Sequence, residues 1–292
     1  MLNFNFGNIS VTRVVEMEMP MLKATEFFPD WEDELVRPHS ELLVPRHFDP
    51  ASGNLIISMQ AFLIRTPRYN ILVDTCVGNH KQRNRKMFDD RVFPWMDRFR
   101  GTGLVPEDID FVLCTHMHVD HVGWNTKLED GNWVPTFPNA KYIFARRELE
   151  YWLGQSEDDQ MTRTGDYVAD SVLPILEAKQ EIVVDLDYQI DEGLTLLPLP
   201  GHTPGMIGLN IKSGDQEAVL CGDLMHHIIQ CHIPAWSTIA CADREAASAT
   251  RHNFLSHYTD TNITILPSHF PNPTAGYIKE SGAAFSFHYL GK

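Results

Sequence analysis

The stretch THMHVDHVGW, residues 115–124, directly follows the apolar run FVLC at residues 111–114. An apolar, β-rich run that stops abruptly at polar residues is typical of a buried strand that delivers a loop at its end. Within that loop, three histidines and one aspartate occupy His116, His118, Asp120 and His121. Imidazole and carboxylate groups are the usual ligands of divalent cations such as zinc, so the stretch predicts a metal site.

The spacing within this loop indicates more than one ion. His116 and His118 are two positions apart, so an extended backbone aims both rings the same way. Asp120 and His121 lie further round the loop, which suggests ligands for a second ion. The alternative is a set of ordinary hydrogen-bonded histidines, but four such residues in six positions would leave buried polar atoms that need partners.

Composition limits the classes of function. The 292 residues are 43% hydrophobic, enough for one large α/β domain or two small ones, and we expect a single domain over residues 1–292 with an irregular arm at about 20–50. The net charge is −15, with 39 acidic against 24 basic side chains. This excess of negative charge argues against nucleic acid and against an anionic membrane as binding partners.

The cysteines and the chain start bear on location. Five cysteines lie scattered without a CxxC pair, which is typical of reduced thiols. The first residues, MLNFNFG, lack the basic and apolar regions of a signal peptide, and no apolar run reaches 18 residues. We therefore expect a cytoplasmic protein that does not span a membrane.

Three further apolar runs also end in a ligand-type residue. His202 stands in PGHTPG after the strand expected at 194–199, Asp223 in CGD after 218–221, and His269 in PSHF after 264–266. Sites in layered α/β folds gather where strands end, so this recurrence supports one shared site.

Two residues near the loop allow two interpretations each. Asp74 follows the strand expected at 69–73, where it orients a ligand histidine through the free ring N–H or caps its own loop. Trp124 either lines the site or belongs to the core. The aromatic residues of the arm, at 27, 28 and 31, form a packed surface loop, a flap over a substrate, or a dimer contact.

The coarse pattern also predicts regular elements elsewhere. Residues 54–65 and 69–73 alternate as two strands, and 243–258 has a helical pattern. Helical pieces broken at Pro94 are expected across 81–100, a turn-rich connection across 131–138, and a helix kinked at Pro174 across 167–180.

These motifs together resemble the metallo-β-lactamase superfamily, from Asp74 to His269 and in the family's order. The resemblance implies an α/β protein with a four-layer αβ/βα metallo-β-lactamase sandwich and two divalent metal ions, with zinc as the expected metal. It assigns the ligands as follows: His116, His118 and His202 to one ion, Asp120, His121 and His269 to the other, and Asp223 to both.

The same resemblance implies a hydrolase that acts on a small molecule through a metal-bridging hydroxide. The expected substrate is a small lactone or carboxylic ester, and Asp120 is expected to manage protons as the leaving group departs. Phosphotriester hydrolysis on the same site is the alternative, followed by an iron-dependent redox member of the family and by a non-catalytic binding protein. The arm also suggests a homodimer.

One position separates the branches of the family. Homoserine-lactone lactonases typically carry a tyrosine three residues after the bridging aspartate, whereas this chain has His226, which resembles methyl parathion hydrolase. His226 is therefore a catalytic candidate, alongside Asp120 and Asp223, that can donate a hydrogen bond or act as an acid. The alternative is a packing histidine next to the ligands.

Overall fold

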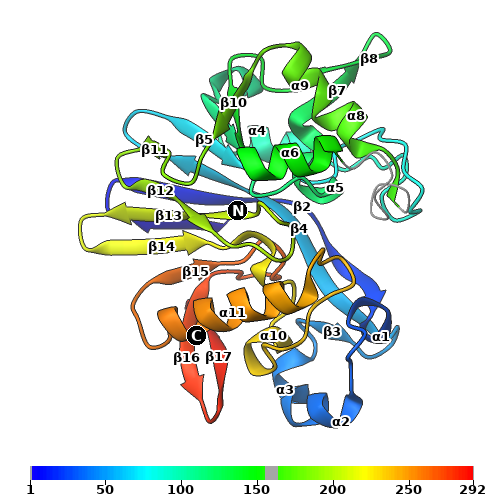
Figure 1. The fold of residues 1–292 in the computed structure, drawn as a ribbon, viewed down its shortest axis with the longest axis vertical. Coiled ribbons are helices and arrows are strands. Elements are labelled where there is room, and N and C mark those ends of the chain that lie inside the picture. Colours follow the sequence, from blue (N-terminus) through cyan, green and yellow to red (C-terminus); the bar gives the residue numbers. More distant parts are fainter. Residues whose placement is uncertain (1, 155–163, 292) are drawn as a thin grey trace. The chain divides into compact units, whose positions relative to one another are not determined.

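The computed structural model describes residues 2–154 and 164–291, and the chain falls into two compact units. Unit 1 comprises Met1–Met17 and Met59–Tyr188, and unit 2 comprises Glu18–Ser58 and Gln189–Lys292. Figure 1 shows the course of the chain through both. In the described part of the chain, every helix is too short or too polar to cross a membrane.

The sheet of unit 1 has the order β1-β2-β4-β5-β6-β9-β10. The strands are β1 (Leu2–Phe6), β2 (Ile9–Lys23), β4 (Asn54–Arg65), β5 (Asn70–Val73), β6 (Phe111–Leu113), β9 (Lys141–Ala145) and β10 (Glu181–Val184). From β5 to β10 the strands are parallel, with Val73 opposite Leu113 and Leu113 opposite Ile143. Their carboxyl ends therefore share one edge, where β5 delivers Asp74 and β6 delivers the histidine-rich loop.

Short helices and one hairpin complete unit 1. The helices are α4 (Trp95–Arg100), η2 (Pro106–Asp108), α5 (Val119–Val122), η3 (Gly123–Asn125), α6 (Arg146–Gly154), α8 (Tyr167–Ser171) and α9 (Leu173–Glu177). The hairpin joins β7 (Thr126–Glu129) to β8 (Asn132–Pro135), where the sequence predicted a turn-rich connection. The predicted kinked helix is two helices, because the chain breaks at Val172, just before Pro174 becomes the second residue of α9.

The prediction of helical pieces before Pro94 was wrong. Residues 81–94 contain turns and no helix, and α4 begins only after Pro94. The Asp89 side chain accepts a hydrogen bond from the backbone N–H of Arg83, and the carbonyl of Lys81 accepts one from Asp90. Side-chain and turn hydrogen bonds thus take backbone groups that a helix would have used.

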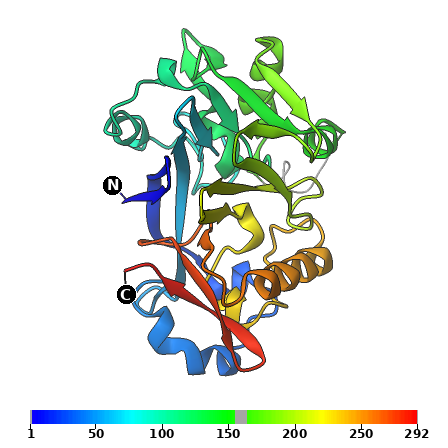
Figure 2. The same ribbon diagram turned by 90° about the vertical axis from the view of Figure 1, so that its left-hand side faces the viewer.

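The sheet of unit 2 runs in sequence order from β11 to β17. Its strands are β11 (Gln189–Asp191), β12 (Leu194–Pro198), β13 (Ile207–Ser213), β14 (Gln216–Leu220), β15 (Thr264–Leu266), β16 (Gly276–Ser281) and β17 (Ala284–Tyr289). Only the β14–β15 pair is parallel, with Leu220 opposite Leu266. These two strands therefore deliver Asp223 and His269 at the same edge. Figure 2 shows the C-terminal β16–β17 hairpin in red.

The arm of unit 2 is built of very short elements, as its prolines predict. They are α1 (Ala24–Phe27), α2 (Asp33–Val36), η1 (Arg37–His39), α3 (Ser40–Leu43) and β3 (Phe48–Asp49), which pairs with the start of β4. Two helices follow later in the chain, α10 (Ile229–His232) and α11 (Arg244–Tyr258). Phe27 and Phe28 are buried in one hydrophobic core with residues of α10 and α11, so the arm is an integral part of unit 2.

Candidate metal centre

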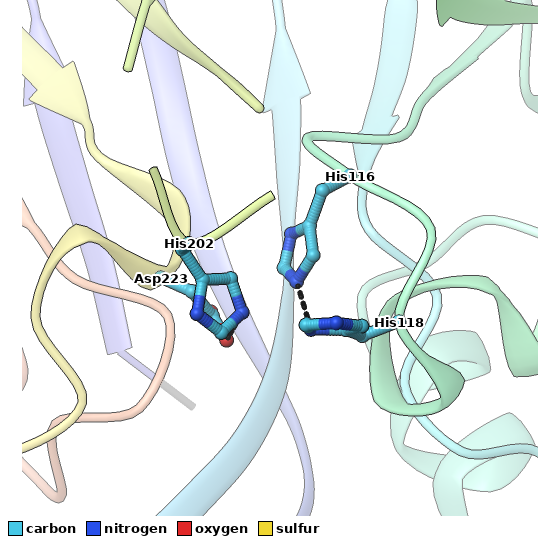
Figure 3. A group of neighbouring side chains, drawn as sticks. All are labelled: His116, His118, His202 and Asp223. Atoms are coloured by element: carbon cyan, nitrogen blue, oxygen red, sulfur yellow. Dashed lines mark hydrogen bonds and ion pairs between the residues drawn. The ribbon is translucent and has the colours of Figure 1, made fainter. Parts of the chain in front are cut away.

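The histidine-rich loop of unit 1 brings two imidazoles together just before α5. The Nε2 atom of His116 lies 3.1 Å from the Nδ1 atom of His118, and the ring centroids are 4.7 Å apart. Figure 3 shows the two rings pointing toward one another. Two ring nitrogens from different side chains thus meet at one point, as they must when they share a cation.

The carboxylate of Asp74 holds this loop through contacts with Thr115 and His121. Its Oδ1 atom accepts the backbone N–H of Thr115 at 2.8 Å, and its Oδ2 atom lies 2.9 Å from Nδ1 of His121. The backbone of Asp74 has φ of 60°, a left-handed conformation that Asp adopts more readily than most residues. Of the two interpretations of Asp74, the structure shows the contact that orients a histidine.

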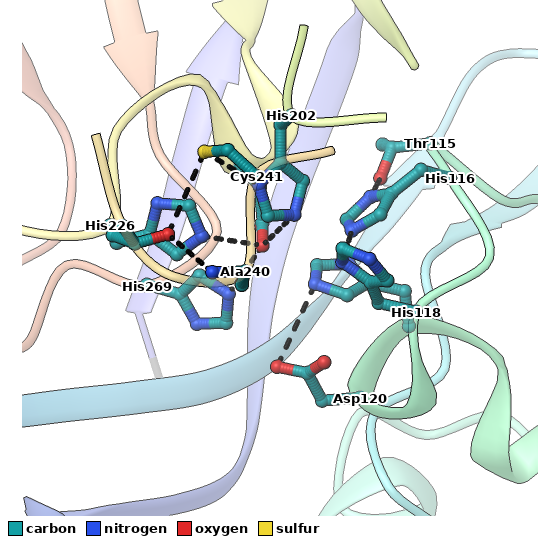
Figure 4. A network of polar contacts seen from close by, with 12 residues as sticks. Thr115, His116, His118, Asp120, His202, His226, Ala240, Cys241 and His269 are labelled. Carbon is teal, nitrogen blue, oxygen red and sulfur yellow. Dashed lines mark hydrogen bonds and ion pairs between the residues drawn. The ribbon is translucent and has the colours of Figure 1, made fainter. Parts of the chain in front are cut away.

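Two further contacts set the rest of the loop. The hydroxyl of Thr115 lies 3.1 Å from Nδ1 of His116 (Figure 4). Asp120 stands in the first turn of α5, with Oδ2 3.8 Å from Nε2 of His121. The four ligand-type residues of the stretch therefore turn their side chains to one side of the loop in unit 1.

Two buried glutamates that the sequence reasoning missed support this loop. Glu16 of β2 accepts hydrogen bonds from the backbone of Val77 and Gly78 and from Nε1 of Trp124. Burial raises the pKa of Glu16 to about 7, although these three hydrogen bonds oppose the rise. Trp124 also stacks on Trp95 with 5.4 Å between centroids, so it belongs to the core of unit 1.

Glu148 of α6 is the second glutamate. Its Oε1 atom accepts the backbone N–H of Met117 at 3.0 Å and Nε1 of Trp152 at 2.6 Å. Met117 lies between the two histidines of the loop, and the ring of Trp152 contacts that of His118 at 5.4 Å. Glu148 therefore fixes the backbone that carries both rings.

In unit 2, His202 lies on the turn after β12. Its Nε2 atom is 3.2 Å from Oδ2 of Asp223, and its Nδ1 atom is 3.5 Å from Sγ of Cys241 (Figure 4). Burial works to lower the pKa of His202, but the contacts with Asp223 and Cys241 outweigh it and raise the pKa to about 9. The preceding Gly201 has φ of 131°, and a Cβ there would lie 2.3 Å from the backbone N of Ala247 in α11. Only glycine therefore fits this turn.

Three histidine side chains of unit 2 lie around the carboxylate of Asp223. Its Oδ2 atom lies 3.2, 3.1 and 3.0 Å from the Nε2 atoms of His202, His226 and His269. One ligand-type atom each from Asp223, His226 and His269 falls within 4.8 Å of the others. His269 is fixed from behind, because its Nδ1 atom lies 2.8 Å from the carbonyl oxygen of Ser58 in β4.

His226 lies beside these ligands against the arm. Its backbone N–H donates to Oε1 of Gln230, and its ring meets that of Phe27 edge to face at 5.4 Å. Burial lowers the pKa of His226 to about 3 in spite of Asp223, so the ring is neutral at pH 7. His227, by contrast, places Nε2 3.0 Å from the carbonyl oxygen of His47 and packs within unit 2.

One pattern runs through both units. In His116, His121, His202 and His269, Nδ1 faces an acceptor of the same unit, namely Thr115, Asp74, Cys241 and Ser58. Metal-binding histidines are held in this way, because the contact fixes the tautomer and aims the other nitrogen at the ion. The donors are imidazole nitrogens and carboxylate oxygens, which suit zinc and similar cations. The residues of each unit therefore fit a metal site.

The structure brings together the predicted ligands within each unit. Unit 1 gathers His116, His118, Asp120 and His121, and unit 2 gathers His202, Asp223, His226 and His269. The supporting residues Glu16, Glu148, Ser58 and Cys241 were missed. No signal in the sequence singles out Glu16, because the stretch of 9–19 also contains Arg13 and Glu18.

Comparison with known proteins follows the same motifs. A family model described as the metallo-beta-lactamase superfamily matches residues 60–255. An N-acyl homoserine lactonase of Bacillus cereus is 29% identical over 181 residues, which cover 58% of this chain and 64% of that protein. A second such lactonase, of Azorhizobium caulinodans, is 34% identical over 110 residues, or 36% of this chain and 37% of the relative.

Solved structures share the whole fold. A hydrolase of the β-lactamase superfamily superposes with a TM-score of 0.82 at 20% identity, covering 99% of this chain and 97% of its own. A dizinc quorum-quenching lactonase, solved with a homoserine product, gives a TM-score of 0.81 at 22% identity and covers 100% and 97%. The fold that the sequence motifs predict is confirmed.

Proposed function

The chain belongs to the metallo-β-lactamase superfamily, and we propose that it is a metal-dependent hydrolase that cleaves a small lactone or another carboxylic ester. One observation carries the proposal: four histidines in two units are each anchored through Nδ1. Such anchoring aims the remaining ring nitrogen and is the usual arrangement around a bound metal.

The proposed ligands are those that the family pattern implies. His116, His118 and His202 would hold one divalent ion, Asp120, His121 and His269 would hold the other, and Asp223 would serve both. The clustering of three Nε2 atoms on Oδ2 of Asp223 supports a central role for this carboxylate. When bound, a pair of such ions, zinc by expectation, supplies a Lewis acid and a water acidified to near-neutral pKa.

The remaining steps fall to side chains of this chain. Asp120 accepts at its carboxylate the proton that the attacking water releases, and passes it to the leaving alkoxide oxygen as the ester carbon–oxygen bond breaks. The neutral ring of His226 donates an N–H to the carbonyl oxygen of the substrate, where negative charge develops. Phe27, which packs on His226, offers apolar contact to the acyl part of the substrate.

The substrate class rests on relatives and on one substitution. The relatives above carry the name N-acyl homoserine lactonase, which supports lactones as the first class to test. His226 replaces the tyrosine expected in such lactonases, and this departure keeps phosphotriesters as the second class. Lactones and phosphotriesters are both cleaved by hydrolysis. Each reaction needs an activated water and a polarised carbonyl or phosphoryl oxygen.

The experiment compares substrate classes on one preparation. Zinc-loaded protein is assayed against N-acyl homoserine lactones, an aryl ester and a phosphotriester, together with Asp223→Asn and the exposed Asp187→Asn as a matched control. We expect lactone cleavage that Asp223→Asn reduces at least about 100-fold and Asp187→Asn leaves unchanged. No cleavage by the loaded protein, or equal cleavage by Asp223→Asn, would refute the proposal. Bound iron with oxygen consumption would identify the redox alternative instead.

The expectations about location, oligomeric state and substrate size stay predictions. A cytoplasmic location is supported by five free cysteines, four of them buried. A homodimer is testable by light scattering on the purified protein. A small-molecule substrate is tested by the panel above.

A further inference from the structure

The side chain of Gln230 in α10 ties the backbone at His226 to the loop that follows this helix. Its Oε1 atom accepts the backbone N–H groups of His226 and His227 at 2.7 and 3.2 Å. Its Nε2 atom donates to the carbonyl of Trp236 at 2.9 Å. Gln230 is fully buried, so these contacts are shielded from water and each is costly to lose.

Arg251 of α11 binds the same carbonyl of Trp236. Its Nη1 atom donates to this oxygen at 2.8 Å and to the carbonyl of Pro234 at 2.6 Å, and its Nη2 atom lies 3.4 Å from the hydroxyl of Ser237. Its Nε atom donates at 2.8 Å to the carbonyl of Leu224, which directly follows the central aspartate. In the described part of the chain no carboxylate pairs with this buried guanidinium, so neutral acceptors alone meet its charge. The charge is therefore tolerated only while these acceptors keep their places.

The ring of His226 lacks the anchor that four histidines of the candidate metal centre have. Those four place Nδ1 against an acceptor of the same unit, whereas neither ring nitrogen of His226 has a hydrogen-bond partner among the residues that the structure describes. Its Nε2 atom lies 3.1 Å from Oδ2 of Asp223, and the ring packs on Phe27. The place of this ring therefore depends on its backbone, which Gln230 holds.

We propose that Gln230 is a positioning residue of the hydrolytic centre, and that Arg251 holds it in place through the shared carbonyl of Trp236. The inference rests on the proposed function, in which His226 donates an N–H to the carbonyl oxygen of the substrate. Gln230 and Arg251 act through His226, since their own polar atoms bind protein groups. A displaced backbone turns the ring away from the oxygen where negative charge develops, which slows the chemical step more than it weakens binding.

The test is a double-mutant cycle between Gln230 and His226. Gln230→Met keeps the length of the side chain and removes its hydrogen bonds, and the exposed Gln189→Met is the matched control. On a substrate that the zinc-loaded wild type cleaves, we expect Gln230→Met to lower kcat about 10–100-fold and to leave KM within about threefold. Gln189→Met should match wild type in both constants.

The same substitution should do little where the imidazole is already absent. In a His226→Ala background we expect Gln230→Met to lower kcat less than about twofold, because its effect passes through the missing ring. An equal fold loss in both backgrounds would overturn the proposal, since it would show that Gln230 supports unit 2 in general and not His226.

Hydrogen exchange of the backbone tests the anchoring without an assay of activity. Arg251→Lys keeps the charge but loses the fork that joins the carbonyls of Leu224 and Trp236. We expect a peptide that covers residues 225–228 to exchange at least about tenfold faster in Gln230→Met and in Arg251→Lys than in wild type or Gln189→Met. Unchanged exchange in both variants would overturn the proposal. A wild type that cleaves nothing would defeat the proposed function, while the exchange measurement would still support or overturn the anchoring of His226 by Gln230.

Discussion

Each of four histidines in the candidate metal centre offers Nε2 because another residue occupies its Nδ1 side. The anchors are a hydroxyl, a carboxylate, a thiol and a backbone carbonyl, so no single chemistry is required. Asp74 is the strongest of them, since an ionised acceptor makes a stronger hydrogen bond than a neutral one.

Replacement of Asp74 tests this orienting role. In Asp74→Asn one acceptor oxygen becomes an NH₂ group, so either Thr115 or His121 loses its contact with the carboxylate. We expect zinc affinity to fall about 10–100-fold. Competition with a chromophoric chelator measures the affinity, with the exposed Asp215→Asn as control. Wild-type affinity in a folded Asp74→Asn protein would contradict the assignment.

Cys241 makes a weaker but separable contribution. Cys241→Ala removes the sulfur that lies 3.5 Å from Nδ1 of His202, and we expect zinc to bind about 10-fold more weakly. Cys241→Ser keeps an acceptor and should recover part of the loss. The cobalt-loaded protein offers an independent readout, since its visible spectrum shifts when a ligand ring turns. Identical spectra and affinities in all three proteins would show that the thiol positions nothing.

At this scale the ligand types were predictable and their anchors were not. His116 and His118 are visible in the sequence because their spacing and their place after an apolar run point to one chemistry. Glu16 and Cys241 act through contacts with residues 108 and 39 positions away, respectively. No local pattern encodes contacts of that length.

Among the elements, two loops at the carboxyl edge of unit 1 cross closely. The backbone N–H of Gly123 donates to the carbonyl of Cys76 at 2.8 Å, and that of Thr75 donates to the carbonyl of His121 at 2.8 Å. A Cβ on Gly123 would lie 1.9 Å from the carbonyl oxygen of Val77. The crossing therefore requires glycine and fixes the position of His121.

Gly123→Ala should force these loops apart. We expect a loss of at least about 2 kcal/mol in the free energy of unfolding, together with weaker zinc binding as His121 moves. Gly154→Ala is the matched control, because a Cβ there meets nothing within 4 Å. Urea unfolding of both variants measures the difference. Equal stability of the two would show that the crossing is not tight.

A buried lysine, Lys81, links β7, β8 and α8 in unit 1. The Nζ atom of Lys81 donates to Thr126 of β7 at 2.6 Å and to the carbonyl of Asp170 in α8 at 3.1 Å, and it lies 3.6 Å from the ring centroid of Trp133 in β8. Burial, assisted by Arg83 and opposed by Asp170, lowers the pKa of Lys81 to about 7. The charged form is thus costly in the folded state.

This shift gives a pH dependence with a definite sign. Between pH 7 and 10.5 the unfolded chain keeps a proton that the folded chain has released, so the free energy of unfolding rises with pH. The rise is at most about 1.4 kcal/mol per pH unit. Urea unfolding at pH 7, 8 and 9 should show it in wild type and in the exposed control Lys86→Met, but not in Lys81→Met. A parallel rise in Lys81→Met would refute the assignment.

Elements were predictable where the pattern was local. The strands at 54–65 and 264–266 have the predicted bounds, because alternation or an unbroken apolar run specifies them. The hairpin at 126–135 and the turns at 81–94 were missed. Both depend on partners elsewhere in unit 1, such as Asp170 for Lys81 and Arg83, which override local propensity.

At the scale of the whole molecule, the proposed centre takes four ligands from unit 1 and three from unit 2. Neither unit alone provides all the ligands that the family pattern assigns to a pair of ions. On the proposed assignment, metal is therefore expected to stabilise the residues of both units. The sequence predicted the ligands but not this division, since we expected a single domain over residues 1–292.

The most direct test of the central claim is X-ray diffraction from metal-loaded crystals, with anomalous data on both sides of the zinc absorption edge. The account predicts two peaks that vanish below the edge. One should contact His116, His118 and His202, the other Asp120, His121 and His269, and Asp223 should reach both. A single peak, or peaks that touch the ligands of only one unit, would contradict it.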